Sequence, residues 1–123
     1  MLAHAHFTAM LPVTDVARAR RFYEERLGLH AKSALPDGEV LFEADGGTFA
    51  LYPRPNPPVS DHTALSWEVP DVRAEVGELR ARGVRFEEYP ELGTRDGVAE
   101  MEGERAAWFK DPDGNILCIH ERH

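Results

Sequence analysis

The sequence predicts an α+β fold of two tandem β-α-β-β-β modules, and three observations support this prediction. A strand–helix pattern occurs twice at one constant offset, each copy continues into further strand-like segments, and the chain closes with a strong hairpin signal. A sheet that carries its helix on one face leaves the other face free. We therefore expect the two sheets to form a cup-shaped, partly open barrel with the helices outside.

Each copy of the repeat joins a strand, an aspartate and a helix that ends at a glycine. Asp15 and Asp71 can accept hydrogen bonds from the exposed amides of the first helical turn. Gly28 and Gly83 suit the left-handed residue just past each helix. Each helix also carries an apolar stripe, which consists of Val16, Ala19, Phe22 or Tyr23 and Leu27 in one copy and Val72, Val76 and Leu79 in the other.

Strand-like segments follow each helix and complete the modules. In the first module they are 31–35, 40–44 and 48–52, separated by a Pro-Asp-Gly and a Gly-Gly turn. In the second module they are 63–69, 84–89 and the final hairpin, with 92–104 expected to be a long loop. We predict a single domain over 1–123, in which module one spans about 6–53, a proline-rich connection 53–61, and module two about 62–121.

The hairpin signal lies at the carboxyl end of the chain. Asp111-Pro112-Asp113-Gly114-Asn115 is flanked by apolar segments, with a proline where a turn needs a fixed φ and a glycine where it needs freedom. The segment therefore predicts strand, tight turn and strand.

Composition limits the functions that the chain can have. A length of 123 residues, with 42% hydrophobic and 29% charged residues, fits one globular domain. The net charge of −8 argues against nucleic acid as a partner. The sequence has no apolar run of about 18 residues, no export signal and a single cysteine, so we expect no membrane association, no intrachain disulfide and a cytoplasmic location.

The repeat and the hairpin together resemble the vicinal oxygen chelate superfamily over essentially the whole chain. This superfamily includes glyoxalase I, fosfomycin and bleomycin resistance proteins and extradiol dioxygenases. A further likeness is His62-Thr63-Ala64-Leu65-Ser66, which resembles the His-x-Ala-Leu-Ser of glyoxalase I. Because small members of this family are commonly homodimers, the resemblance implies a homodimer.

The resemblance also indicates where a metal would bind. Metalloenzymes of the family take ligands from the first and last strands of each module, and the corresponding positions here include Thr8, His62 and Cys118. Residues 49–52 offer no ligand, and only His62 matches, so we expect no metal cofactor. The alternative is a divalent transition metal (Zn, Ni, Fe or Mn) held by His62 with His6, Cys118 or His120, since strand residues two apart share a face.

Without a metal, the cup becomes an apolar pocket with a few polar groups. Resemblance to fosfomycin resistance proteins selects Trp108 as facing the ligand, and strand alternation adds the side chains of the same phase, including Ala64 and Ile116. Residues of the opposite phase, such as Phe7, Trp67 and Ile119, are expected to pack beneath the helices. The predicted ligand-binding residues are Trp108, His62, Ser66, Glu68, Cys118 and Lys110.

Two functions are compatible with these residues. The first is metal-independent binding and sequestration of a small aromatic or amphipathic molecule, similar in kind to the bleomycin resistance proteins. The second is a metal-dependent lyase, isomerase or dioxygenase with a non-standard His/Cys site, in which Glu68 is the candidate for moving the proton.

Overall fold

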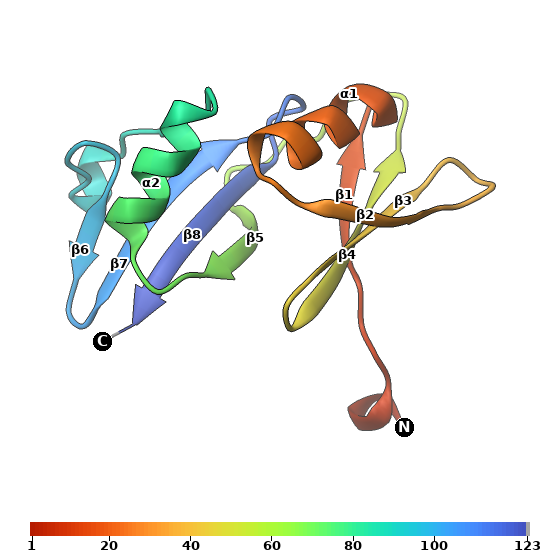
Figure 1. Cartoon of the computed structure of the whole chain (residues 1–123), viewed down its shortest axis with the longest axis horizontal. Coiled ribbons are helices and arrows are strands. Elements are labelled where there is room, and N and C mark those ends of the chain that lie inside the picture. The colour runs from red at the N-terminus through yellow and green to blue at the C-terminus, as the bar shows by residue number, and fades with distance from the viewer. Residues whose placement is uncertain (123) are drawn as a thin grey trace. The chain divides into compact units, whose positions relative to one another are not determined.

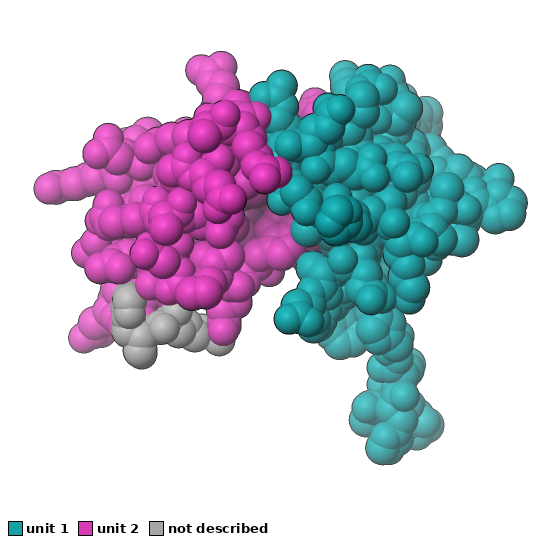
Figure 2. All heavy atoms as spheres, viewed as in Figure 1, with its two compact units in different colours: residues 1–58 teal, residues 59–123 magenta. Residues whose placement is uncertain are grey.

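The structure, a computed structural model, describes residues 1–122, with Arg122 described by its backbone alone. The chain divides into two compact units, residues 1–58 and residues 59–123, which Figure 2 shows in teal and magenta. The boundary falls inside the predicted connection 53–61. Each unit is a β-α-β-β-β module, so the predicted α+β class is confirmed. The cup that the two sheets would form, and the single domain that would contain them, stay predictions.

Both units have the same order of elements (Figure 1). The first unit contains η1 (Leu2–His4), β1 (Ala9–Val13), α1 (Val16–Arg21), the π-helical turn η2 (Phe22–Arg26), β2 (His30–Ala34), β3 (Val40–Ala44) and β4 (Gly47–Pro53). The second unit contains β5 (Thr63–Glu68), α2 (Val72–Ala81), the 3-10 turn η3 (Pro90–Leu92), β6 (Ala99–Met101), β7 (Glu104–Lys110) and β8 (Ile116–Arg122).

The two sheets share one topology. Their strand orders are β1-β4-β3-β2 and β5-β8-β7-β6. The first and last strands of each unit are parallel neighbours, while the other neighbouring strands are antiparallel. The last strand therefore lies between the first strand and its own hairpin partner.

The predicted helix caps are confirmed in both units. The carboxylate of Asp15 accepts a hydrogen bond from the backbone N–H of Arg18 at 3.0 Å, and that of Asp71 accepts one from Ala74 at 3.1 Å. Gly28 and Gly83 follow the helices with φ of 72° and 91°. Their left-handed conformation ends each helix and returns the chain to the sheet.

An aromatic cluster forms the core of the first unit. Tyr23 is fully buried, with its ring centroid 5.8 Å from that of Phe42 and 5.5 Å from that of Phe49. Phe42 and Phe49 stack on each other at 5.2 Å. Together these rings join the helical segment to β3 and β4.

The core of the second unit lies between α2 and one face of its sheet. Val72, Val76 and Leu79 are buried on the helix, as the apolar stripe predicted, and α2 contacts β7 and β8. Burial of each such side chain contributes about 1.5–3 kcal/mol. Trp67 stacks on the buried Phe109 at 6.5 Å, on the same face as Ile119, so its predicted phase is confirmed.

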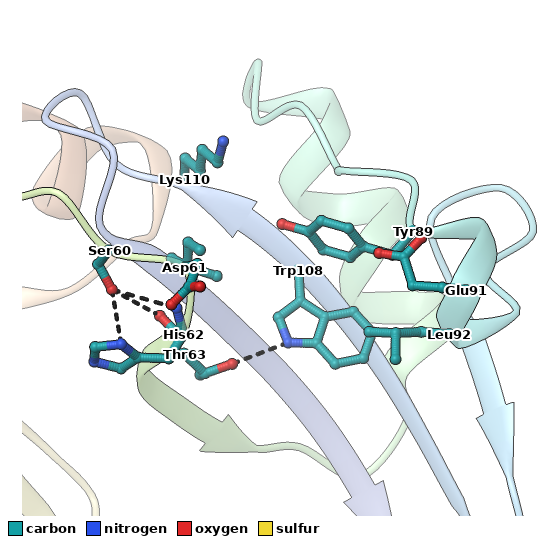
Figure 3. A pocket seen from close by; sticks show the side chains of 10 residues that line it. Ser60, Asp61, His62, Thr63, Tyr89, Glu91, Leu92, Trp108 and Lys110 are labelled. Carbon is teal, nitrogen blue, oxygen red and sulfur yellow. Dashed lines mark hydrogen bonds between the residues drawn. The ribbon is translucent and has the colours of Figure 1, made fainter.

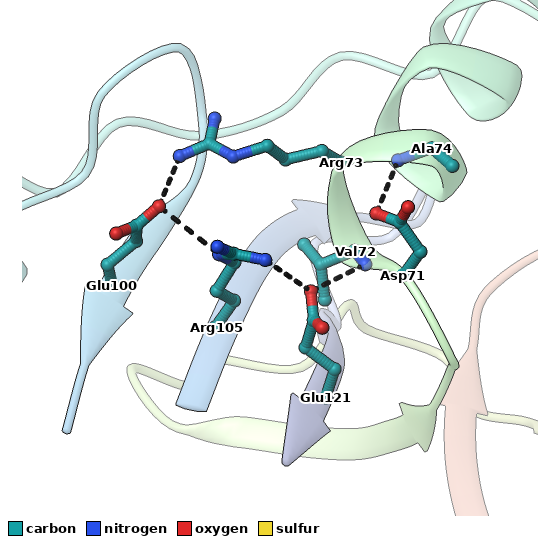
Figure 4. A network of polar contacts seen from close by, with 7 residues as sticks. All are labelled: Asp71, Val72, Arg73, Ala74, Glu100, Arg105 and Glu121. Carbon is teal, nitrogen blue, oxygen red and sulfur yellow. Dashed lines mark hydrogen bonds and ion pairs between the residues drawn. The ribbon is translucent and has the colours of Figure 1, made fainter. Parts of the chain in front are cut away.

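A polar network fixes the start of α2 on this sheet (Figure 4). The buried carboxylate of Glu121 accepts a hydrogen bond from the backbone N–H of Val72 at 2.9 Å and lies 3.6 Å from the guanidinium of Arg105. Arg105 and Arg73 both donate to Glu100, which lowers the pKa of that carboxyl, mainly through the bond from Arg73. The network therefore ties the helix to β6, β7 and β8.

The predicted strand over 84–89 is wrong. Within that segment the structure forms only an isolated bridge between Phe86 and Phe109, and the next strand is β6, inside the segment expected to be a loop. Ala99 to Met101 pair with β7 through a tight turn whose Gly103 has φ of 70°. The composition of β6, which is short and polar, is that of a loop. Its strand conformation comes from its pairing with β7, which the local sequence does not indicate.

The predicted packing of Phe7 beneath a helix is also wrong. Strand β1 begins at Ala9, so Phe7 precedes the sheet, and 86% of its surface is exposed. Strand alternation does not extend to residues outside the paired segment.

No helix among residues 1–122 is long and apolar enough to cross a membrane.

The turn of the final hairpin is held by a buried carboxylate. One oxygen of Asp111 accepts hydrogen bonds from the backbone N–H groups of Asp113 and Asn115, both at 2.9 Å. Its other oxygen accepts from the side-chain amide of Asn115 at 2.8 Å. These bonds close the turn and fix the β7–β8 register, from Lys110 opposite Ile116 onward.

Replacing Asp111 with Ala should lower the free energy of unfolding by about 2–4 kcal/mol, because three buried donors lose their acceptor. Urea unfolding followed by circular dichroism measures the change. The matched control is Asp37→Ala, which removes hydrogen bonds with Glu39 in an exposed turn and should change stability little. Equal losses in the two variants would contradict this role of Asp111.

Candidate ligand-binding site

The candidate site lies on the face of the second sheet opposite α2. Cys118 on β8 pairs with Ser66 on β5 and with Trp108 on β7, and His120 pairs with Glu68 and Ala106. Residues directly opposite one another in a sheet share a face. Two cross-strand rows of chemically varied side chains therefore stand on this face, while the apolar residues of opposite phase pack against the helix.

A pocket of about 510 Å³ opens at one end of this face, entirely within the second unit. Figure 3 shows Trp108 between two short segments, one around His62 and one around Tyr89, with Lys110 at the end of β7. Three of the six predicted ligand-binding residues, Trp108, His62 and Lys110, line it. The lining residues are Ser60, Asp61, His62, Thr63, Tyr89, Glu91, Leu92, Trp108, Lys110 and Ile116.

The ring of Trp108 is held in a defined orientation. Its Nε1 donates a hydrogen bond to the hydroxyl of Thr63 at 3.2 Å. Tyr89 meets it edge-on, with 5.7 Å between ring centroids and 77° between ring planes. The indole is half-buried. Thr63 on β5 and Tyr89 therefore hold the ring in place, while part of it still lines the pocket.

The polar groups around the ring carry both charges. The ammonium of Lys110 lies 3.6 Å from the carboxylate of Glu87, and Asp61 and Glu91 add acidic groups to the lining. Burial, followed by the nearby Glu87, raises the pKa of Tyr89 above its ordinary value. The phenol of Tyr89 therefore stays protonated at neutral pH and can donate a hydrogen bond.

His62 stands at the other wall of the pocket. Its Nδ1 lies 3.0 Å from the hydroxyl of Ser60, and the residue is exposed. The Ser60 hydroxyl therefore orients the imidazole, and Figure 3 shows Thr63 between His62 and Trp108.

The other three predicted residues lie farther along the same face and do not line the pocket. The hydroxyl of Ser66 is 2.6 Å from Nδ1 of His120, and Nε2 of His120 is 3.7 Å from the carboxylate of Glu68. Cys118 is buried beside them, and burial raises the pKa of its thiol although a hydrogen bond with Ser66 opposes the shift. Three of the predicted residues thus line the pocket, and the other three, Ser66, Glu68 and Cys118, lie with His120 in a separate polar cluster.

A bulge in β5 changes one predicted orientation. Thr63 pairs with Ile116, but the next pair is Leu65 with Leu117, so Ala64 is the extra residue. Thr63, not Ala64, therefore lies on the Trp108 face, and the prediction for Ala64 is wrong. A single unpaired residue shifts the phase of everything before it, and the sequence carries no glycine there to indicate it.

Another wall of the pocket is formed by Tyr89, Glu91 and Leu92, which were not among the residues predicted from the sequence. An available signal was Pro90, since proline has no backbone N–H and is unfavourable within a paired strand. The chain forms the 3-10 turn η3 at Pro90 instead of continuing as a strand, and Tyr89, just before this turn, contacts Trp108.

The donors of the second unit fit a transition metal poorly. His62 precedes the Thr63–Ile116 pair, whereas Cys118 lies two residues beyond it, a separation of about 10 Å along the strands. Two ligands of one zinc ion must lie within roughly 4.5 Å of each other. Burial raises the pKa of the Cys118 thiol, so a metal ion binding there would have to displace the proton of a buried thiol.

Within residues 1–122, the structure gathers no group of three or more His, Cys, Asp or Glu side chains suited to a metal ion. His6 belongs to the first unit, where its Nε2 lies 2.9 Å from the hydroxyl of Thr48. Thr8 lies beside the same hydroxyl at 3.4 Å. The pairing of His62 with His6 joins residues of different units and stays a prediction.

Comparison with known proteins identifies one family. The family model described as the Glyoxalase/Bleomycin resistance protein/Dioxygenase superfamily matches residues 3–119. Among curated proteins, the search found no significant match.

Several solved structures share the fold at low identity. TnmS3, an antibiotic binding protein from Streptomyces sp. CB03234, has a TM-score of 0.72 and 22% identity, covering 98% of each chain. The fosfomycin resistance protein FosX from Listeria monocytogenes has 0.75 and 15%, covering 97% of this chain and 93% of its own. Lactoylglutathione lyase from Agrobacterium tumefaciens has 0.69 and 19%, covering 96% and 93%. These similarities establish the fold.

The raised pKa of the Cys118 thiol predicts low reactivity. At pH 8 the folded protein should react with iodoacetamide at least roughly tenfold more slowly than the same chain unfolded in urea, because less thiolate is present and the sulfur is buried. Intact-mass spectrometry over time measures both rates. Equal rates in the two states would contradict this description of Cys118.

Proposed function

The chain belongs to the Glyoxalase/Bleomycin resistance protein/Dioxygenase superfamily, and on this premise we propose that it binds a small aromatic or amphipathic molecule without a metal ion. The role would be sequestration of the resistance type. The proposed binding site is the pocket beside Trp108, and the proposed setting is a cytoplasmic homodimer.

The observation that carries the proposal is the fixed indole of Trp108. A ring already held by Thr63 and Tyr89 loses little conformational entropy when a ligand stacks on it. Tyr89, Leu92 and Ile116 supply further apolar or aromatic surface to the lining, and a few polar groups can set orientation. This combination suits a flat ligand with polar substituents.

Charge favours a cationic ligand. Two acidic residues, Asp61 and Glu91, line the pocket. The positive charge of Lys110, which also lines it, lies beside the carboxylate of Glu87. The net charge of the chain, −8, acts in the same direction at longer range. Trp108 adds an aromatic face, which attracts cations. The structural similarity to TnmS3, an antibiotic binding protein, supports a role of this kind.

The second candidate is a metal-dependent lyase, isomerase or dioxygenase. The observation that favours it is His62, which lines the pocket and matches the family's ligand position on the first strand of the second module. A stoichiometric metal that is lost in His62→Ala would support this candidate. Binding that persists in this variant without metal would support sequestration.

Replacing Trp108 with Ala should weaken binding of the cationic aromatic dye proflavine by at least roughly tenfold, because the dye loses its stacking surface. Isothermal titration calorimetry measures the affinity, and 8-anilinonaphthalene-1-sulfonate serves as an anionic aromatic comparison. We expect proflavine to bind more tightly than this anion, because acidic groups line the pocket.

Trp67→Phe is the matched control, since Trp67 lies on the opposite face of the same sheet and outside the pocket lining. It should leave dye affinity unchanged. If Trp108→Ala binds both dyes as tightly as the unaltered protein does, Trp108 is not the binding surface.

A further inference from the structure

The polar cluster beside the pocket has the geometry of an activated nucleophile. Ser66 on β5 and His120 on β8 are diagonal neighbours on one sheet face, and the serine oxygen lies 2.6 Å from Nδ1 of the imidazole. Nε2 of the same ring lies 3.7 Å from the Glu68 carboxylate. A nucleophile in contact with a base, and a base faced by a third group, define the arrangement that activates serine.

The roles of the three groups follow from the hydrogen-bond inventory. In the tautomer that carries its proton on Nε2, the imidazole presents a lone pair at Nδ1, and the Ser66 hydroxyl donates to it. The N–H then faces Glu68, whose negative charge stabilises the imidazolium formed when Ser66 loses its proton. The separation of 3.7 Å makes Glu68 an electrostatic partner in this state, and such contacts commonly tighten when substrate binds.

Access favours serine over the neighbouring cysteine. Ser66 is exposed, whereas Cys118 is only 6% exposed and burial raises the pKa of its thiol. Ser66 and Trp108 flank Cys118 in the same cross-strand row. A ligand that stacks on Trp108 and extends across the row would bring a substituent to the serine hydroxyl.

We propose that Ser66, activated by His120, is a nucleophile that accepts an acyl group from an activated ester on this sheet face. Ser66 Oγ attacks the ester carbonyl, its proton passes to Nδ1 of His120, and the C–O bond to the leaving alcohol breaks with the electron pair on that oxygen. A strongly basic leaving alcoholate takes the proton from His120, whereas nitrophenolate leaves as the anion and the proton goes to solvent. Water then gives a proton to His120 as its oxygen attacks the acyl carbonyl, the bond between the acyl carbon and Oγ breaks, and His120 returns the proton to Oγ as the acid leaves.

The probe is p-nitrophenyl acetate, which yields nitrophenolate and acetyl-serine. Release of nitrophenolate is followed by absorbance, and peptide mass mapping of acid-quenched protein locates the acetyl group. We expect acetylation at Ser66, abolished in Ser66→Ala and slowed roughly 100-fold in His120→Gln. Glu68→Gln should slow acylation with little change in KM, and Glu68→Asp should recover part of the rate, as expected of a positioning residue.

Ser33→Ala and His30→Gln are the matched controls, since both residues lie on β2 of the first unit and belong neither to the pocket lining nor to the group formed by Ser66, His120 and Glu68. Both should react as the unaltered protein does. Circular dichroism confirms that each variant is folded, which Ser66→Ala should be because this side chain is exposed. Acetylation at Lys110, Cys118 or the amino terminus alone, an unchanged rate in Ser66→Ala, or no acetylation at all would overturn the proposal. None of these outcomes bears on dye binding at Trp108.

Discussion

The position of β8 between β5 and β7 is the constraint on which the second unit depends. Parallel pairing with β5 and antiparallel pairing with β7 determine which side chains stand opposite one another. Phe109, Leu117 and Ile119 are thereby directed toward α2, and Ser66, Cys118 and Trp108 are aligned on the opposite face. A slip of one residue in either pairing would exchange the two faces.

Two buried carboxylates hold this strand in place, one at each end. Asp111 closes the turn before β8 through three hydrogen bonds, and Glu121 near its end accepts from the start of α2. The first bonds set the β7–β8 register, while the second positions the helix on the sheet. Both carboxylates therefore support the face that carries Trp108, although neither lines the pocket.

The sequence alone predicted most of the fold because its signals were local. The Asp caps, the glycines that end each helix and the final turn are defined by a few adjacent residues, and the structure has all of them. Strand β6 escaped prediction because only its pairing with β7 makes it a strand. The bulge at Ala64 is likewise a property of two strands together.

The site was predictable only to the extent that the family resemblance and strand phase specify it. The resemblance selected Trp108, His62 and Cys118, and strand phase added Ser66 and Glu68; the registers place Trp108, Ser66, Glu68 and Cys118 on one face. It could not show that Tyr89 approaches Trp108 from a turn, or that Ser66 lies within hydrogen-bond distance of His120. Such contacts join residues distant in sequence and depend on side-chain conformations that no local pattern records.

The central claim is that ligand binding at Trp108 needs no metal, and the most direct test combines metal analysis with a titration. The protein is purified without nickel resin, its transition metals are quantified per chain by plasma mass spectrometry, and its proflavine affinity is measured with and without EDTA. The account predicts far less than one equivalent of metal and an affinity that EDTA leaves unchanged. Close to one equivalent of a transition metal, together with binding that EDTA abolishes, would contradict it.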